Sequence, residues 1–312
     1  MYAEKYKTIR KEYTGSIEMK ELMEEFIGYL HNKKNVSYNT EISYQRDLKK
    51  LEEYFEKEKI DRWEDVRETD IQGYLSKMRE ENFASATISR NIATIRAFFQ
   101  YLLKQGIIRE DPSENLKPPK VEKKLPQILT VQEVDRLLEM PDQSTAKGLR
   151  DRAMLELLYA TGMRVSELIH LKLSDLNLQM GYVICHDTNK ERIIPIGNVS
   201  RDILATYVEK VRDFFIKNKK ETALFTNCQG KIMSRQGFWK ILKGYAAAAG
   251  IQCDITPHTL RHSFAVHMLQ NGADVKSVQE MLGHSDISST QMYLGVNAVK
   301  MRDVYMKAHP RR

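Results

Sequence analysis

The amino-acid sequence predicts a mainly α-helical protein of two domains, with a small antiparallel β-sheet in the second domain. Three observations favour this fold class. Apolar residues recur at helical spacing through most of the chain, one pair of β-branched runs flanks a polar turn, and a proline- and lysine-containing stretch separates two halves. The 312 residues, of which 42% are hydrophobic, are enough for two buried cores. We place the domains at 1–110 and 127–312, joined by a linker at 111–126.

Helices account for the first domain. We expect Ser37 or Asn39 to cap the second of them, Thr69 to open the third, and Gly106 to stop the fourth, because these residue types favour helix ends. The four expected helices cover residues 19–30, 37–59, 69–81 and 85–104.

The linker has the sequence DPSENLKPPKVEKKLP, which holds four of the chain's eight prolines and several lysines. Proline stiffens such a segment and lysine attracts phosphate. The alternative is a plain surface loop, although long structureless loops are uncommon inside one domain.

The second domain is expected to begin with helices and to contain one hairpin. Thr130 is placed to cap a helix over 131–140, and a second helix over 148–159 ends at Thr161 and Gly162. The runs GYVICHD and ERIIPIG flank a turn at Thr188 and Asn189, which predicts a β-hairpin. Helices return after it.

Composition bounds the chemistry and the compartment. A net charge of +7 fits a polyanionic partner, although a slightly basic soluble protein is an equal alternative. The three cysteines show no CxxC spacing, which favours a reducing compartment over a disulfide scaffold or a zinc site. No apolar run reaches membrane-spanning length, and the first residues lack a signal-peptide core. We therefore expect a cytoplasmic protein without a membrane partner.

The most informative stretch is TPHTLRHSFAVHMLQNGADVKSVQEMLGHSDISSTQMYL, residues 256–294. His258 and Arg261 are three residues apart near the expected start of a helix, so they share a face at its positive end. His284 follows the glycine that ends the next helix, and Tyr293 is placed on one more short helix. Arg164 lies about ninety residues upstream of His258.

These residue types suit metal-free attack on a phosphodiester. Guanidinium forks grip the oxygens that gather charge in the transition state. A histidine can remove the proton of a tyrosine hydroxyl, whose pKa is about 10, and a lysine can protonate the leaving oxygen. A phosphotyrosine bond conserves the energy of the broken bond, so no cofactor is required.

Each residue also has a structural interpretation. Tyr293 alone suits a half-buried helix position, His284 alone suits a cap after glycine, and Arg164 alone can pair with Glu167. The functional interpretation therefore depends on all of them together, in this order.

Together the motifs resemble those of a known family. ATGMRVSEL at 160–168, HTLRHSFAVHML at 258–269 and LGHSDISSTQMYL at 282–294 resemble the three signature boxes of the tyrosine recombinases, closest to the Xer-type recombinases and their integrase relatives. SYNTEISYQRDL at 37–48 resembles the family's N-terminal DNA-binding helices. The resemblance implies a helical SAM-like core-binding domain and a mixed α+β catalytic domain that close around DNA as a clamp.

The resemblance also implies a role for each motif residue. Tyr293 would be the nucleophile of a 3′-phosphotyrosyl bond, Arg164 and Arg261 would clamp the scissile phosphate, His258 would act as general acid and base, His284 would hydrogen-bond the phosphate, and Glu167 would orient the turn that carries Arg164. It implies no metal and no cofactor.

The catalytic lysine is where the sequence departs from the family. Xer-type relatives usually carry a Gly-Lys-Gly turn before an Asn-Lys-Glu-Arg run. Here the run is present at 189–192, but His186, Asp187 and Thr188 precede it. Lys190 is the best replacement as general acid, and its alternative role is a contact to a backbone phosphate.

The resemblance implies double-stranded DNA with a specific recombination site as the partner. Four protomers, as a homotetramer or with a paralogue, would exchange strands between two sites through a Holliday junction, and a C-terminal helix at about 297–312 would dock into a neighbouring protomer. Chromosome dimer resolution and mobile-element integration or excision both remain open, as does the DNA target.

The rival interpretations are a type IB topoisomerase-like enzyme and a non-catalytic DNA-binding relative. A metal-dependent nuclease is disfavoured, because no carboxylate cluster with ligand spacing accompanies the histidines.

Overall fold

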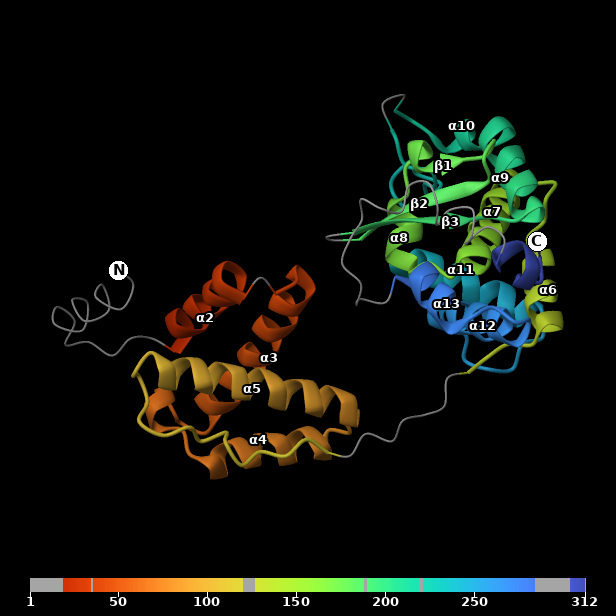
Figure 1. Cartoon of the computed structure of the whole chain (residues 1–312). Coiled ribbons are helices and arrows are strands. Elements are labelled where there is room, and N and C mark those ends of the chain that lie inside the picture. Colours follow the sequence, from red (N-terminus) through yellow and green to blue (C-terminus); the bar gives the residue numbers. More distant parts are fainter. Residues whose placement is uncertain are drawn as a thin grey trace. The chain divides into compact units, whose positions relative to one another are not determined.

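The computed structural model describes residues 19–34, 36–119, 127–187, 190–218, 221–283 and 304–311. The chain divides into two compact units, Met1–Lys124 and Leu125–Arg312 (Figure 1). Each unit has its own hydrophobic core. Among the described helices, none has the length and apolar character to cross a membrane.

The first unit is helical, as predicted. Its elements are α2 (Met19–Lys34), α3 (Tyr38–Lys57), the 3₁₀ turn η1 (Trp63–Asp65), α4 (Glu68–Glu80) and α5 (Ser85–Lys104). Ser37, and not Asn39, caps α3, because its side chain accepts the N–H of Thr40. The prediction that Thr69 opens the next helix was wrong. Arg67 holds the N-cap of α4, and the Asp70 carboxylate accepts its N–H at 2.8 Å.

Aromatic side chains fill the core of the first unit. Trp63 is buried and meets Phe98 edge-to-face, with ring centroids 4.8 Å apart. Its indole N–H donates to the carbonyl of Met19 at 2.9 Å. A buried indole therefore fixes the start of α2 against α5, with its one polar atom satisfied.

The second unit combines helices with a small sheet. Its elements are α6 (Val131–Glu139), α7 (Ala146–Thr161), α8 (Val165–His170), η2 (Leu173–Asp175), β1 (Leu176–Asn177), β2 (Tyr182–Asp187), β3 (Lys190–Pro195), α9 (Asn198–Lys210), α10 (Arg212–Phe215), α11 (Arg235–Ala248), α12 (Pro257–Gln270) and α13 (Val275–Leu282). The strands form one antiparallel sheet in the order β1-β2-β3. Val183 lies opposite Ile194 in the β2–β3 hairpin, and both are buried. The predicted fold class and hairpin are confirmed.

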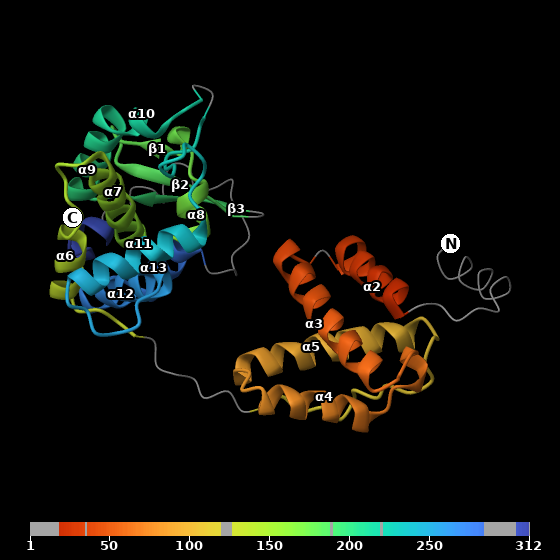
Figure 2. The ribbon, with the colours of Figure 1, turned by 180° about the vertical axis from the view of Figure 1, so that it is seen from behind.

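Helix α7 lies at the centre of the second unit. It contacts α6, α8, α9 and α12. Figure 2, which views the molecule from behind, shows α7 beside α6 and α9. It begins two residues before the predicted position, because Thr145 caps it by accepting the N–H of Gly148 at 3.0 Å. It ends, as predicted, at Gly162, whose φ of 58° is left-handed.

The C-terminal segment packs on its own unit over residues 304–311. The buried Tyr305 hydroxyl accepts the N–H of Gly197 at 3.2 Å. Arg311 donates to both carboxylate oxygens of the buried Glu156, at 3.2 and 2.6 Å. Docking of the whole segment 297–312 into a neighbouring protomer stays a prediction, since residues 297–303 and 312 lie outside the described part.

Replacement of Gly162 should destabilise the second unit. A Cβ atom there would lie 2.4 Å from Cδ1 of Phe264 and 2.9 Å from Cδ2 of Leu282, on a backbone with φ of 58°. Overpacking and the left-handed conformation together predict that Gly162→Ala lowers the free energy of unfolding by about 3 kcal/mol. Urea titration measures it.

The matched control is Gly244→Ala in α11. A Cβ at Gly244 meets no atom within 4 Å, and alanine is the better helix former by about 1 kcal/mol. We expect this variant to be as stable as the wild type or more so. Equal unfolding free energies for Gly162→Ala and the wild type would contradict the packing argument.

Candidate active site

Arg164 lies at the N-cap of α8, just after the glycine turn that ends α7. Its main-chain N–H donates to Oε2 of Glu167 at 2.6 Å, and its Nη1 donates to Oε1 at 3.2 Å. The pairing with Glu167 that the sequence suggested is therefore present. This pairing does not use the whole guanidinium, because Nη2 also donates to the carbonyl of Gly283 at 3.2 Å.

Arg261 comes from α12 and is buried. Its Nη1 donates to the carbonyl of Gly162 at 2.7 Å, and its Nη2 donates to the carbonyl of Leu282 at 2.6 Å. The side chain thus joins the end of α7 to the end of α13. Two arginines that are 97 positions apart in the sequence meet at one helix end.

Arg192 is a third arginine at the same place, and it was given no role from the sequence. It lies on β3, where its Nε donates to the carbonyl of Met281 at 2.8 Å. Its Nη1 and Nη2 donate to the two carboxylate oxygens of Glu167 at 2.7 and 2.8 Å. The signal available in the sequence was its position two residues after Lys190.

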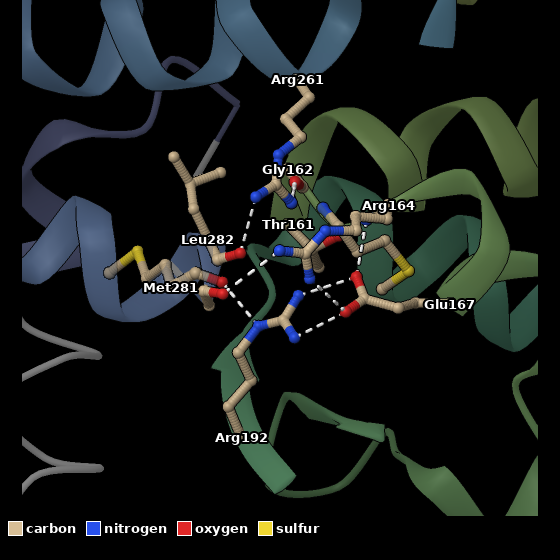
Figure 3. Close-up of polar contacts among 10 residues, drawn as sticks. Thr161, Gly162, Arg164, Glu167, Arg192, Arg261, Met281 and Leu282 are labelled. Atoms are coloured by element: carbon tan, nitrogen blue, oxygen red, sulfur yellow. Dashed lines mark hydrogen bonds and ion pairs between the residues drawn. The ribbon is translucent and has the colours of Figure 1, made fainter. Parts of the chain in front are cut away.

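The three arginines bind three consecutive carbonyls. Arg192 binds the carbonyl of Met281 and Arg261 binds that of Leu282 (Figure 3). Arg164 binds the carbonyl of the next residue, Gly283. The last carbonyls of a helix lack an N–H partner within the helix and carry partial negative charge. The C-terminal end of α13 is therefore the acceptor that gathers these guanidinium groups.

The cluster has an excess of positive charge. Burial, together with the charges of Arg164 and Arg192, lowers the pKa of Arg261 to about 10. Burial opposes ionisation of Glu167, but the hydrogen bonds and charge of Arg192, with those of Arg164, lower the pKa of its carboxyl. Three cations with one carboxylate form a favourable place for a phosphate group.

His258 occupies the first turn of α12. The helix starts where it was expected: Thr256 caps it and Pro257 follows as its first residue. The exposed imidazole of His258 has a lowered pKa, through burial of part of the ring and then the charges of His262 and Arg261. A neutral imidazole at the positive end of a helix is able to accept a proton beside a bound anion.

The remaining predicted site residues are placed only in part. His284 and Tyr293 lie outside the described residues, and Gly283 directly precedes the first of them. Lys190 is the first residue of β3, and its backbone pairs with Asp187 of β2. The structure thus brings Arg164 and Arg261 together, with His258 on the helix that carries Arg261.

The chain is similar to known proteins along nearly its whole length. Residues 127–299 match the family model described as the phage integrase family, and residues 23–106 match the phage integrase N-terminal SAM-like domain. A protein of Oceanobacillus iheyensis named tyrosine recombinase XerD is 49% identical over 292 residues, which cover 93% of this chain and 98% of that protein. A protein of the same name from Staphylococcus epidermidis is 47% identical, covering 94% and 100% of the two chains.

Solved structures share the fold. The XerH site-specific recombinase bound to difH substrate matches with a TM-score of 0.66 and 22% identity, over 91% of this chain and 82% of that one. The lambda integrase(75-356) dimer bound to a COC' core site matches with a TM-score of 0.68 and 18% identity, over 88% and 100% of the two chains.

The β2–β3 hairpin, which carries Lys190, has ionic contacts of its own. The imidazole of His186 on β2 lies 3.1 Å from Oδ1 of Asp175 and 2.9 Å from Oε1 of Glu191. The hydrogen bond and charge of Asp175, supported by Glu191, raise the pKa of His186, although burial acts in the opposite direction. The protonated imidazole therefore ties β2 to η2 and to β3.

This contact predicts a pH-dependent contribution to stability. The raised folded-state pKa means that the contribution is fully present below the ordinary histidine pKa of about 6.5 and is lost as pH rises through the higher folded-state value. His186→Gln should lower the free energy of unfolding more at pH 6 than at pH 9, as measured by urea titration at both values. In an Asp175→Asn background the pH-dependent part should shrink. An equal loss at both pH values would exclude a charged His186.

Proposed function

The chain belongs to the phage integrase family of tyrosine recombinases, and from that premise we propose that it recombines DNA at specific sites through a 3′-phosphotyrosyl intermediate. The observation that carries the proposal is the arginine cluster at the end of α13. There the guanidinium groups of Arg164 and Arg261 donate to the carbonyls of Gly283 and Leu282, and His284 is the next residue of the chain. The partner is double-stranded DNA, in keeping with the DNA-bound structures to which the fold is similar.

Arg164 and Arg261 hold the scissile phosphate. The carbonyls of Gly162, Leu282 and Gly283 orient their guanidinium groups, so little reorganisation is needed when the phosphate becomes pentacoordinate. Planar forks match pairs of phosphate oxygens, which a lysine ammonium does not. His284, which follows Gly283 directly, supplies a further hydrogen bond to the same phosphate.

The strand breaks by in-line displacement. The hydroxyl oxygen of Tyr293 forms a bond to phosphorus as its proton passes to neutral His258, and the bond from phosphorus to the 5′ oxygen breaks. Lys190 gives a proton to that leaving oxygen. The reverse reaction, with a 5′ hydroxyl of the partner strand as attacking group, releases Tyr293 and rejoins the DNA.

Recombination of two sites uses four protomers. Two sites with two cleavage positions each require four nucleophiles, and strand exchange in pairs passes through a Holliday junction. The protomers are identical or include a paralogue. We propose that the C-terminal segment links neighbouring protomers. To do so, it would give up the contacts that Tyr305 and Arg311 make within their own unit.

Removal of the nucleophile tests the reaction. Tyr293→Phe should abolish the covalent complex with a nicked suicide substrate, because phenylalanine has no oxygen to attack phosphorus. DNA affinity in a mobility-shift assay should stay within about twofold of the wild type, since one hydroxyl adds little to a contact dominated by phosphate charges.

Tyr182→Phe is the control, since its hydroxyl contacts Asn177 at 3.3 Å on the sheet. This variant should form the covalent complex normally. Covalent complex from Tyr293→Phe would refute the assigned nucleophile, and its absence from the wild type would refute the proposed reaction.

A sulfur-substituted substrate tests Lys190. Lys190→Ala should slow cleavage of ordinary DNA by about 10²-fold or more if the lysine is the general acid. A thiol has a pKa of about 8.5 and leaves without a proton. Single-turnover cleavage of DNA with sulfur at the bridging 5′ position should therefore proceed at the wild-type rate in this variant.

Lys190→Arg is the matched control for charge. Its guanidinium keeps the positive charge but does not release a proton near neutral pH. It should also be slow on ordinary DNA and normal on the sulfur substrate. Slow cleavage of both substrates by Lys190→Ala would assign this lysine to phosphate binding instead.

A further inference from the structure

Arg192 joins three elements that are far apart in the sequence. It is carried by β3, it binds the carboxylate of Glu167 on α8, and it binds the carbonyl of Met281 in the last turn of α13 (Figure 3). Nothing in the reaction described above uses it directly. Its side chain is 13% exposed and that of Glu167 is 6% exposed, so the pair is mostly buried.

We propose that Arg192 is a positioning residue, which fixes the β2–β3 hairpin, and with it Lys190, against the helix end that holds the phosphate-binding arginines. This inference rests on the proposed function. Lys190 precedes Arg192 by two residues on the same strand. Arg192 therefore anchors the hairpin to the end of α13, where the other two arginines bind, and it lies two residues from Lys190, the proposed general acid.

The contact geometry demands arginine. The two terminal nitrogens bind the two oxygens of Glu167 at 2.7 and 2.8 Å while Nε binds Met281 at 2.8 Å. A planar fork sets direction as well as distance, whereas an ammonium group sets distance alone. The orientation of β3 relative to α8 and α13 is thus specified, and not only its proximity.

Gly283 shows how closely this anchor fits. A Cβ atom on Gly283 would lie 2.9 Å from Nη1 of Arg192 and 3.0 Å from its Cζ. The guanidinium therefore rests directly on the backbone at the end of α13, where glycine also provides the left-handed φ of 65°. The residue after this glycine is His284, so the same packing ties the hairpin to the point where the chain continues to the proposed nucleophile.

Strand pairing connects the position of Arg192 to that of Lys190. Arg192 is paired with the buried Cys185 on β2, and Lys190 is paired with Asp187 at the end of the hairpin. A misplacement of about 1 Å at a catalytic group can cost about 10²-fold in rate. Loss of the anchor should therefore act on proton donation to the leaving oxygen, more than on DNA binding.

The test compares Arg192→Gln and Arg192→Lys with the wild type on two DNA substrates. Single-turnover cleavage of ordinary DNA at saturating protein should fall by about 10- to 100-fold in Arg192→Gln, with DNA affinity within about threefold of the wild type. On DNA with sulfur at the bridging 5′ position, which needs no general acid, the rate should return to within about threefold. Arg192→Lys, which keeps the charge without the fork, should show a smaller defect that sulfur also removes.

Arg201→Gln is the matched control. This half-buried arginine of α9 has its Nε 3.8 Å from Oδ1 of Asp202, and its loss should leave both rates unchanged. The inference is overturned if the Arg192 variants cleave ordinary DNA at the wild-type rate, or if they are slowed equally on both substrates. Failure of the proposed function is distinguishable, because the wild type itself would then form no covalent complex with either substrate.

Discussion

The site depends on the end of one short helix. Three guanidinium groups repel one another, and burial adds a cost to each charge. They are held together because the last two residues of α13 and its glycine cap, residues 281–283, direct their carbonyls at them, one arginine to each. Arg192, Arg261 and Arg164 come from β3, α12 and α8, so these three elements are fixed to α13 by the same contacts.

These contacts orient the guanidinium groups for a phosphate. Each carbonyl uses part of a guanidinium and sets its plane, which reduces the ordering that a substrate would have to impose. Three guanidinium groups and one carboxylate leave the cluster positively charged, and burial first, then the charges of Arg164 and Arg192, lower the pKa of Arg261. A bound phosphate would supply the missing negative charge, and the guanidinium planes would align it as it binds.

Local signals allowed much of this to be predicted from the sequence. Helix α12 starts at the Thr256 cap and Pro257, and α13 starts at the Asp274 cap and ends at the left-handed Gly283. Each of these signals involves only neighbouring residues of the sequence. The starts of α4 and α7 were misplaced, because Arg67 and Thr145 took the N-cap positions. Arg192 could not be assigned, since its partner Met281 is 89 residues away and no local rule connects a strand residue to a distant helix carbonyl.

Glu167 determines how the remaining roles are divided. Its Oε1 accepts from Nη1 of Arg164 and Nη1 of Arg192, and its Oε2 accepts from the main-chain N–H of Arg164 and Nη2 of Arg192. A carboxylate offers about four lone-pair sites, and these four hydrogen bonds occupy them. A glutamine would offer one oxygen to the same donors and lose the charge that two arginines share. Because its lone pairs are committed and its pKa is lowered, Glu167 is unsuited to carry a proton, and proton transfer must fall to groups outside the cluster.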